Sequence, residues 1–171
     1  MTTMISKPHI QLMAQYSGWM NDKLYEVCAQ IDDDTRRENR GAFFGSIHLT
    51  LNHLLHGDRM FLSRFEGKVE QFAPLGSELF SDFGDLRRER QATDQHLQEW
   101  ANSVKEDWLS TALTYKSMSD GKTRTIEHWI LVTHLFNHGT HHRGQITTLL
   151  SQLGLDVGAT DIPFMPRFLA Q

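Results

Sequence analysis

The segment that decides the fold is residues 127–154, EHWILVTHLFNHGTHHRGQITTLLSQLG. Its apolar residues recur three or four positions apart, which is the spacing of one face of a helix. The stripe on that face runs through Leu131, Leu135, His138, His142, Ile146, Leu149 and Leu153. The segment is therefore predicted to be a helix from about Glu127 to Leu153 that ends at Gly154.

Two histidines occupy the middle of this core-facing stripe. His138 and His142 are four residues apart, which places their rings about 40° apart around the helix and one turn apart along it. Such a pair can bind one metal ion, as in helical zinc sites. An imidazole among aliphatic side chains is costly unless its nitrogens find partners, and a metal supplies one for each ring. The competing interpretation is a polar network of packed core histidines.

The chain contains ten histidines, and five of them lie between residues 128 and 142. His134 lies one turn before His138 on nearly the same face, and His141 lies about 60° around the helix from His138. We expect both at the rim of a site or as partners of its ligands, because a metal-bound imidazole usually has a partner on its other nitrogen.

A second helix must contribute to such a site, because two histidines do not complete the coordination of a metal. Residues 46–65 have helical spacing, a serine suited to the N-cap and Gly67 just past the end. This helix offers His48, His53 and His56. His53 lies at the edge of the apolar stripe, whereas the other two are less constrained and can face solvent.

Two more long helices are predicted from the apolar period. One begins at Pro8, which suits a first helical turn, and runs to about Ile31. The other spans residues 83–104. Its predicted inward face consists of Leu86, Arg90, Thr93, Leu97, Trp100 and Ala101.

The connections are also predicted from local sequence. Residues 112–117 and 122–126 alternate around a Ser-Asp-Gly turn, which predicts a small β-hairpin before the last helix. Residues 32–37 are expected to be a solvated connection and residues 68–82 a long loop. Two prolines in the C-terminal tail are expected to keep it from being helical.

Four helices of about twenty residues predict an all-α fold, a four-helix bundle forming a single domain over residues 1–171. The long loop allows the second and third helices to run parallel. The net charge of −4 argues against a nucleic-acid partner, and the lack of a long apolar run argues against a membrane span or a signal peptide. The single cysteine, Cys28, favours a reducing cytoplasm and is expected to be a small buried hydrophobe rather than a nucleophile.

Three residues near the histidines have their own interpretations. Asp58 falls in an apolar seam, where it can orient a histidine, pair with Arg143 or form a surface salt bridge. Arg143 is expected to be an ion-pair partner rather than a catalytic group. Gly144 costs a helix about 1 kcal/mol relative to alanine, so close approach of another helix or of a substrate is expected there.

The segments SIHLTLNHLLHGDRMFLSRFEG (46–67) and HLFNHGTHHRGQITTLLSQLG (134–154) resemble the DinB-like family, as do the phrases YSGWMNDKLYEVC and TDIPFMP. The resemblance covers nearly the whole chain. It implies a four-helix bundle in up-down-down-up order and a homodimer. It also implies a site for one divalent ion, nickel or zinc, held by His53 of LNHLL and by His138 and His142 of FNHGTHHRG.

Related branches of the family include metal-dependent S-transferases that use low-molecular-weight thiols, and some members are regarded as hydrolases. Three imidazoles leave a position open on the metal, where a thiol or water would ionise. The sequence has no H-E-x-x-H motif, and Glu127 is three turns from the histidines. Thiol transfer is therefore favoured over hydrolysis. The alternatives are a non-catalytic metal-binding or stress-related dimer and a purely structural bundle.

Overall fold

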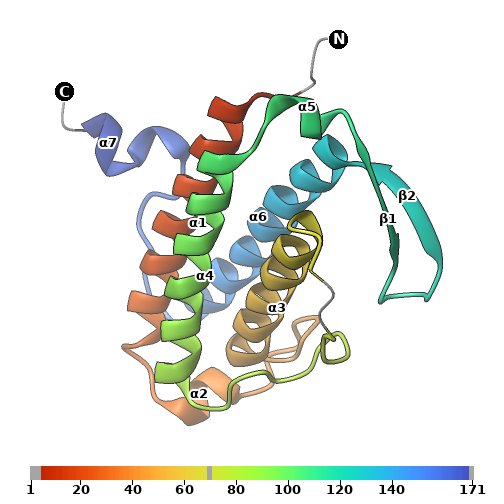
Figure 1. The fold of residues 1–171 in the computed structure, drawn as a ribbon. Helices are drawn as coiled ribbons and strands as arrows, with labels where there is room; N and C mark the ends of the chain where they lie inside the picture. The colour runs from red at the N-terminus through yellow and green to blue at the C-terminus, as the bar shows by residue number, and fades with distance from the viewer. Residues whose placement is uncertain (1–4, 69–70, 170–171) are drawn as a thin grey trace.

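A computed structural model describes residues 5–68 and 71–169 of the chain, and Figure 1 shows its fold. The described part is mostly helical, with one small two-stranded antiparallel sheet. Its long helices are α1 (Lys7–Cys28), α3 (Ile47–Phe65), α4 (Phe83–Ser103) and α6 (His128–Gln152). The four long helices predicted from the sequence are therefore confirmed. Within residues 5–68 and 71–169 no helix has both the length and the apolar character needed to cross a membrane.

Local signals in the sequence set the ends of these helices. Ser46 is the N-cap of α3, and its hydroxyl accepts a hydrogen bond from the Leu49 N–H at 3.1 Å. Asp82 caps α4 in the same way, at 2.8 Å. Gly67 and Gly154 follow the last turns of α3 and α6 with φ of 67° and 77°, a left-handed conformation that glycine adopts without strain.

Each long helix packs against two of the others: α1 contacts α4 and α6, and α3 contacts the same two helices. Most buried apolar residues fall into two large clusters, one around Phe65, Trp100 and Leu131 and the other around Leu51 and Ile146. A layer of buried polar residues lies between these clusters along the helices. It contains Asn21, Asp58, Arg90, Thr93, His142 and Arg143.

Asp58 belongs to a buried ion-pair network in this polar layer. Arg90 of α4 donates to Asp58 at 2.7 Å and lies 2.8 Å from Asp94, which in turn accepts from Asn21 at 2.9 Å. Burial works to lower the pKa of Arg90, but Asp94 and Asp58 raise it above its usual value. The interpretation of Asp58 as a surface ion pair is wrong. Its direct partner is an arginine of another helix, and Arg143 attracts it only at longer range.

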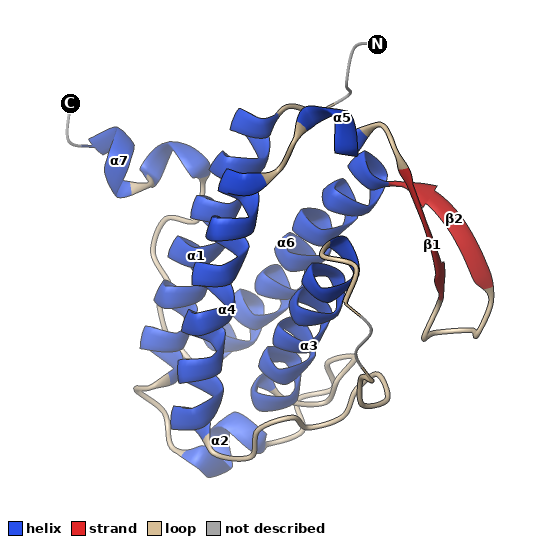
Figure 2. Cartoon of the chain, in the orientation of Figure 1, coloured by secondary structure: helices blue, strands red, loops and turns tan. Residues whose placement is uncertain are grey.

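The predicted hairpin is confirmed as β1 (Ala112–Lys116) and β2 (Thr123–Glu127), with Tyr115 opposite Arg124. Figure 2 shows it extending from the start of α6 and standing apart from the long helices. Its turn places Met118 and Ser119 beside the same pockets as Leu75 of the loop that follows α3.

Short helices lie in segments that the sequence predicted to be irregular. Residues 32–37 contain α2 (Asp33–Arg37), because Asp32 caps a helical turn and the buried Arg36 donates to the Cys28 carbonyl at 2.9 Å. A further turn not predicted from the sequence is α5 (Glu106–Leu109).

The C-terminal tail is also partly helical, with the 3-10 helix η1 (Ile162–Phe164) and α7 (Pro166–Leu169). The prediction that its prolines exclude helix is wrong. Pro163 and Pro166 lie in the first turns of these short helices, where a missing N–H removes no intrahelical hydrogen bond.

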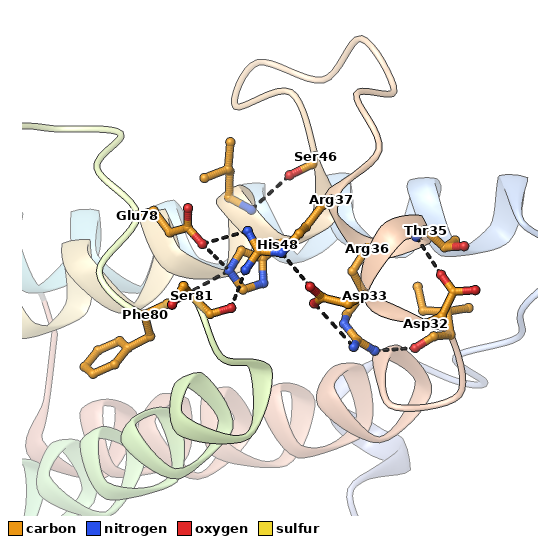
Figure 3. A network of polar contacts seen from close by, with 12 residues as sticks. Asp32, Asp33, Thr35, Arg36, Arg37, Ser46, His48, Glu78, Phe80 and Ser81 are labelled. Carbon is orange, nitrogen blue, oxygen red and sulfur yellow. Dashed lines mark hydrogen bonds and ion pairs between the residues drawn. The ribbon is translucent and has the colours of Figure 1, made fainter.

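The connection from α3 to α4 is a loop, as predicted, apart from residues 69–70, which lie outside the described residues. Polar contacts hold this loop against α2 and α3 (Figure 3). His48 Nε2 lies 3.0 Å from the Glu78 carboxylate and 2.9 Å from the Phe80 carbonyl, and Arg37 donates to the same carboxylate at 2.8 Å. The expectation that His48 can face solvent is therefore wrong, because this residue fastens the loop to α3.

Candidate metal centre

Three histidines meet where α3 packs against α6. The Nε2 atom of His138 lies 3.1 Å from that of His53 and 3.1 Å from that of His142. One ligand atom from each ring lies within 4.8 Å of the others. His53 and His142 are buried and His138 is half-buried. The structure thus brings together the three residues singled out from the sequence, and their role as metal ligands stays a prediction.

The geometry of the three nitrogens fits a metal better than it fits hydrogen bonds. An imidazole nitrogen carries either one proton or one lone pair, so the His138 Nε2 cannot make two good bonds to two other Nε2 atoms. Three lone pairs directed at a common ion remove this conflict. Metal–nitrogen distances of about 2.0–2.1 Å in a tetrahedral site require nitrogens about 3.3–3.4 Å apart, close to the separations found for His138.

A glycine of α3 provides the space for the His138 ring. A Cβ on Gly57 would lie 2.8 Å from Cε1 of His138, closer than real Cβ contacts allow, and 3.3 Å from its Nδ1. Gly57 follows His53 by one helical turn, so the same face of α3 carries one histidine and accommodates another. Sequence reasoning missed this residue, because nothing in α3 alone shows which side chain it faces.

Gln145 sets the tautomer of His142. Its side-chain oxygen lies 2.8 Å from Nδ1 of His142, so the proton of the neutral ring is on Nδ1 and the lone pair is on Nε2, where the three rings meet. This is the usual supporting contact of a metal-bound imidazole. Gln145 was not singled out from the sequence, although its position three residues after His142 on one helix is a usable signal.

The surroundings keep the cluster uncharged at neutral pH. Burial, and then the neighbouring His142, lower the pKa of His53 to about 4. Burial, followed by the other histidines around it, lowers the pKa of His138 to about 3. Phe44, from the loop before α3, stacks on His53 with ring centres 3.8 Å apart and covers one face of that ring. Neutral imidazoles are the form that binds a metal.

Two pockets open beside the cluster. The larger, of about 900 Å³, contains His53 and His142 and is walled by Phe44, Leu75 and the hairpin turn. The smaller, of about 360 Å³, contains His53 and His138 and extends between α3, α6 and the hairpin. Among the described residues, neither pocket is lined by an aspartate or a glutamate. A small molecule can therefore reach the cluster, and the described lining offers it no carboxylate as a general base.

The other histidines lie outside the cluster. His134 and His141 are exposed and lie at the rim, each lining one of the two pockets, with ring centres 5.7 Å from His138 and 4.9 Å from His142 respectively. His56 is buried on α3 and is not part of the group of three, so the expectation that it can face solvent is wrong.

Two expectations for residues next to His142 are also tested: the approach of another helix to Gly144 and an ion pair of Arg143 are both wrong, whereas the approach of a substrate to Gly144 stays a prediction. A Cβ on Gly144 would meet nothing within 4 Å, so no element of the described chain approaches it closely. The close approaches are at Gly57 and at Gly139, where a Cβ would lie 2.9 Å from the Arg143 guanidinium. Arg143 is buried over the Tyr16 ring at 5.5 Å and forms no ion pair with a described residue within 4.0 Å.

Cys28 is fully buried in the second apolar cluster, and burial raises the pKa of its thiol to about 12. A thiol that stays protonated and inaccessible is a poor nucleophile. The structure therefore supports the interpretation of Cys28 as a packed hydrophobe.

The fold and this cluster define a predominantly helical protein with a pocketed three-histidine site. The model of the DinB family matches residues 2–169, and the chain belongs to the DinB family. Protein DinB of Bacillus subtilis (strain 168) is 26% identical over 153 residues, which cover 86% of this chain and 87% of that protein. A crystal structure of a DinB-like protein from Bacillus cereus has a TM-score of 0.62 at 19% identity, covering 82% of this chain and 90% of that one. That structure shows a likeness of fold alone.

Proposed function

We propose that this protein binds one divalent metal ion, nickel or zinc, through His53, His138 and His142, and that it acts as a metal-dependent S-transferase for low-molecular-weight thiols. The observation that carries the metal site is the pair of 3.1 Å contacts on the single Nε2 atom of His138. A bound ion would supply Lewis acidity and lower the pKa of a thiol that reaches it.

The residues of the chain itself would prepare and shield this site. Gly57 makes room for the His138 ring, and Gln145 keeps the His142 lone pair on Nε2. Phe44 covers one face of His53 and excludes water from it. The two pockets, both bordered by the hairpin turn, would give a substrate access to the cluster.

Thiol transfer is favoured over hydrolysis by the lining of the pockets. Hydrolysis at a metal commonly uses a carboxylate to take a proton from water, and the described lining of both pockets contains none. A thiol needs less help, because its ordinary pKa of about 8.5 already lies close to neutrality.

We further propose that the four long helices form a bundle in up-down-down-up order. Along α1 and α6 the residues of the cluster around Phe65 come before those of the cluster around Ile146, and along α3 and α4 they come after. This order supports a bundle in which α1 and α6 run in one direction and α3 and α4 run in the opposite direction.

A homodimer in the cytoplasm is also part of the proposal. The family resemblance supports the dimer, and so does the apolar surface of the C-terminal segment, where Phe164 and Leu169 are 49% and 64% exposed. Light scattering coupled to gel filtration measures the mass directly, and a mass near 20 kDa for each particle would contradict the dimer.

Elemental analysis of protein purified without a histidine tag, from unsupplemented medium, tests the metal site. We expect about one equivalent of nickel or zinc in the wild type and less than about a tenth of that in His53→Ala, His138→Ala and His142→Ala, because losing one of three ligands opens the site. His141→Ala is the matched control, since it removes a neighbouring exposed histidine of α6. A metal content equal to that of the wild type in all four variants would refute the site.

Cobalt(II) substitution tests the reaction class separately. If a coordination position is open to substrate, 2-mercaptoethanol should add a sulfur-to-cobalt charge-transfer band in the near ultraviolet, whereas ethylene glycol should not. A protein that binds cobalt but shows no thiol-dependent band would favour the alternative of a non-catalytic metal-binding dimer.

A further inference from the structure

The smaller pocket has an arginine at the end away from the three histidines. His53, Gly57, Phe61 and Arg64 all line it from α3 and lie four, four and three residues apart, which is one face of a helix. Arg64 follows His53 by eleven residues, about 16 Å along the axis. Side chains of a helix lean toward its N-terminus, so Arg64 leans toward the histidine end.

Contacts with two elements hold the Arg64 guanidinium in place. Its carbon lies 4.6 Å from the centre of the Tyr115 ring and 5.5 Å from that of Phe61. Its Nη2 donates to the backbone carbonyl of Lys116 in β1 at 3.3 Å. The group is therefore a positioned part of the pocket wall, with most of its N–H donors still available.

The charge of Arg64 is not balanced by a carboxylate in the described part of the chain, where no ion pair within 4.0 Å includes it. Its half-buried position lowers the pKa of Arg64, and among the described residues Tyr115 opposes this shift. Arg124 lines the same pocket but is paired, with both ends of its guanidinium bound to Asp120 at 2.8 and 2.7 Å. A desolvated cation without a counter-charge is unfavourable, so Arg64 is suited to an anion from outside the chain.

The lining of the smaller pocket also favours an anion as its ligand. The chain has more acidic residues than basic ones, 21 against 17, yet none of the described residues lining this pocket is acidic. A single guanidinium balances one negative charge, and its planar fork matches a carboxylate. A phosphate dianion would require further donors.

We propose that the smaller pocket binds a carboxylate-bearing small molecule, with its carboxylate paired to Arg64 and its reacting group at the three-histidine end. This assignment of substrate class rests on the proposed function for the reacting end. The carboxylate pair itself depends only on Arg64 and can be tested without the reaction.

The test uses S-methylglutathione and its diethyl ester, because the methylated sulfur cannot ionise and binding then does not depend on a thiolate–metal bond. Isothermal titration of the metal-loaded full chain with each probe measures both affinities. We expect the wild type to bind the acid at least about 10-fold more tightly than the ester, the range of one charge-assisted hydrogen bond.

Three variants identify the residue responsible. Arg64→Met keeps the apolar stem on Tyr115 but removes the charge, and the preference for the acid should fall below about 3-fold. Arg64→Lys keeps the charge without the planar fork of the guanidinium and should retain part of the preference for the acid. Arg124→Met is the matched control, an arginine of the same pocket that is already paired, and should keep the wild-type preference.

Equal affinity of the wild type for the two probes would overturn the proposal, as would an unchanged preference in Arg64→Met or an equal loss in Arg124→Met. Metal content, measured on the same samples, keeps the two proposals apart. An Arg64-dependent preference in a protein without metal would refute the metal site and leave the carboxylate site standing.

Discussion

Replacing Gly57 by alanine should weaken metal binding strongly while leaving α3 folded. The added Cβ would lie 2.8 Å from Cε1 of His138, whereas carbon atoms in contact are separated by about 3.5 Å or more. The ring must therefore move by about 0.7 Å, the difference between these two values. Metal–ligand distances tolerate about 0.2 Å, so we expect zinc affinity to fall about 100-fold, the upper range for disturbing the support of a ligand.

The effect on the stability of the metal-free protein should be small, because two terms oppose each other. Alanine in a helix interior is favoured over glycine by about 1 kcal/mol, and overpacking a core costs about 1–3 kcal/mol. With free zinc at 100 times the wild-type Kd, the wild type gains about 2.7 kcal/mol, and a variant with 100-fold weaker binding gains about 0.4 kcal/mol. For a chain of this size the difference corresponds to about 5–9 °C in Tm.

The assay is thermal melting with and without zinc, together with competition for zinc against a chromophoric chelator. Gly144→Ala is the matched control, since it adds a methyl group to another helical glycine that has nothing within 4 Å. This control should be stabilised by about 1 kcal/mol and bind zinc normally. A Gly57→Ala variant that binds zinc as tightly as the wild type would refute the role of this glycine in placing His138.

Three other outcomes are expected. The pKa values of His53 and His138 in the folded protein, about 4 and 3, lie below the value of about 6.5 for an unfolded chain. The unfolded state therefore binds more protons below pH 6.5, and the Tm of the metal-free protein should fall as the pH is lowered from 7 to 5. A constant Tm over this range would contradict these shifts. Asp58→Asn should cost about 3 kcal/mol in urea unfolding by breaking a buried ion pair, against less than about 1 kcal/mol for Glu26→Gln in an exposed pair. Gln145→Met should weaken zinc binding about 10-fold by removing the partner of the ligand's Nδ1, and an unchanged chelator competition would show that this contact does not support the site.

Much of the fold follows from signals that act within a few residues. The apolar period predicted α1, α3, α4 and α6, and Ser46 and Gly154 lie at the helix ends where their chemistry places them. The hairpin could be predicted in the same way, because the alternation of residues along a strand and the sequence of a turn are also local signals. The same local reasoning failed for Pro163 and Pro166, because a proline excludes the interior of a helix but suits its first turn.

The sequence by itself determined that His138 and His142 share one face of one helix, because four residues make about one turn. Only the tertiary structure decided what stands opposite them. His53, 85 residues before His138 in the chain, meets them, whereas His48 and His56 of the same helix are buried elsewhere. The spacing along α3 fixes how its residues are arranged around its own axis, but the packing of α3 against α6 decides which of them faces the pair.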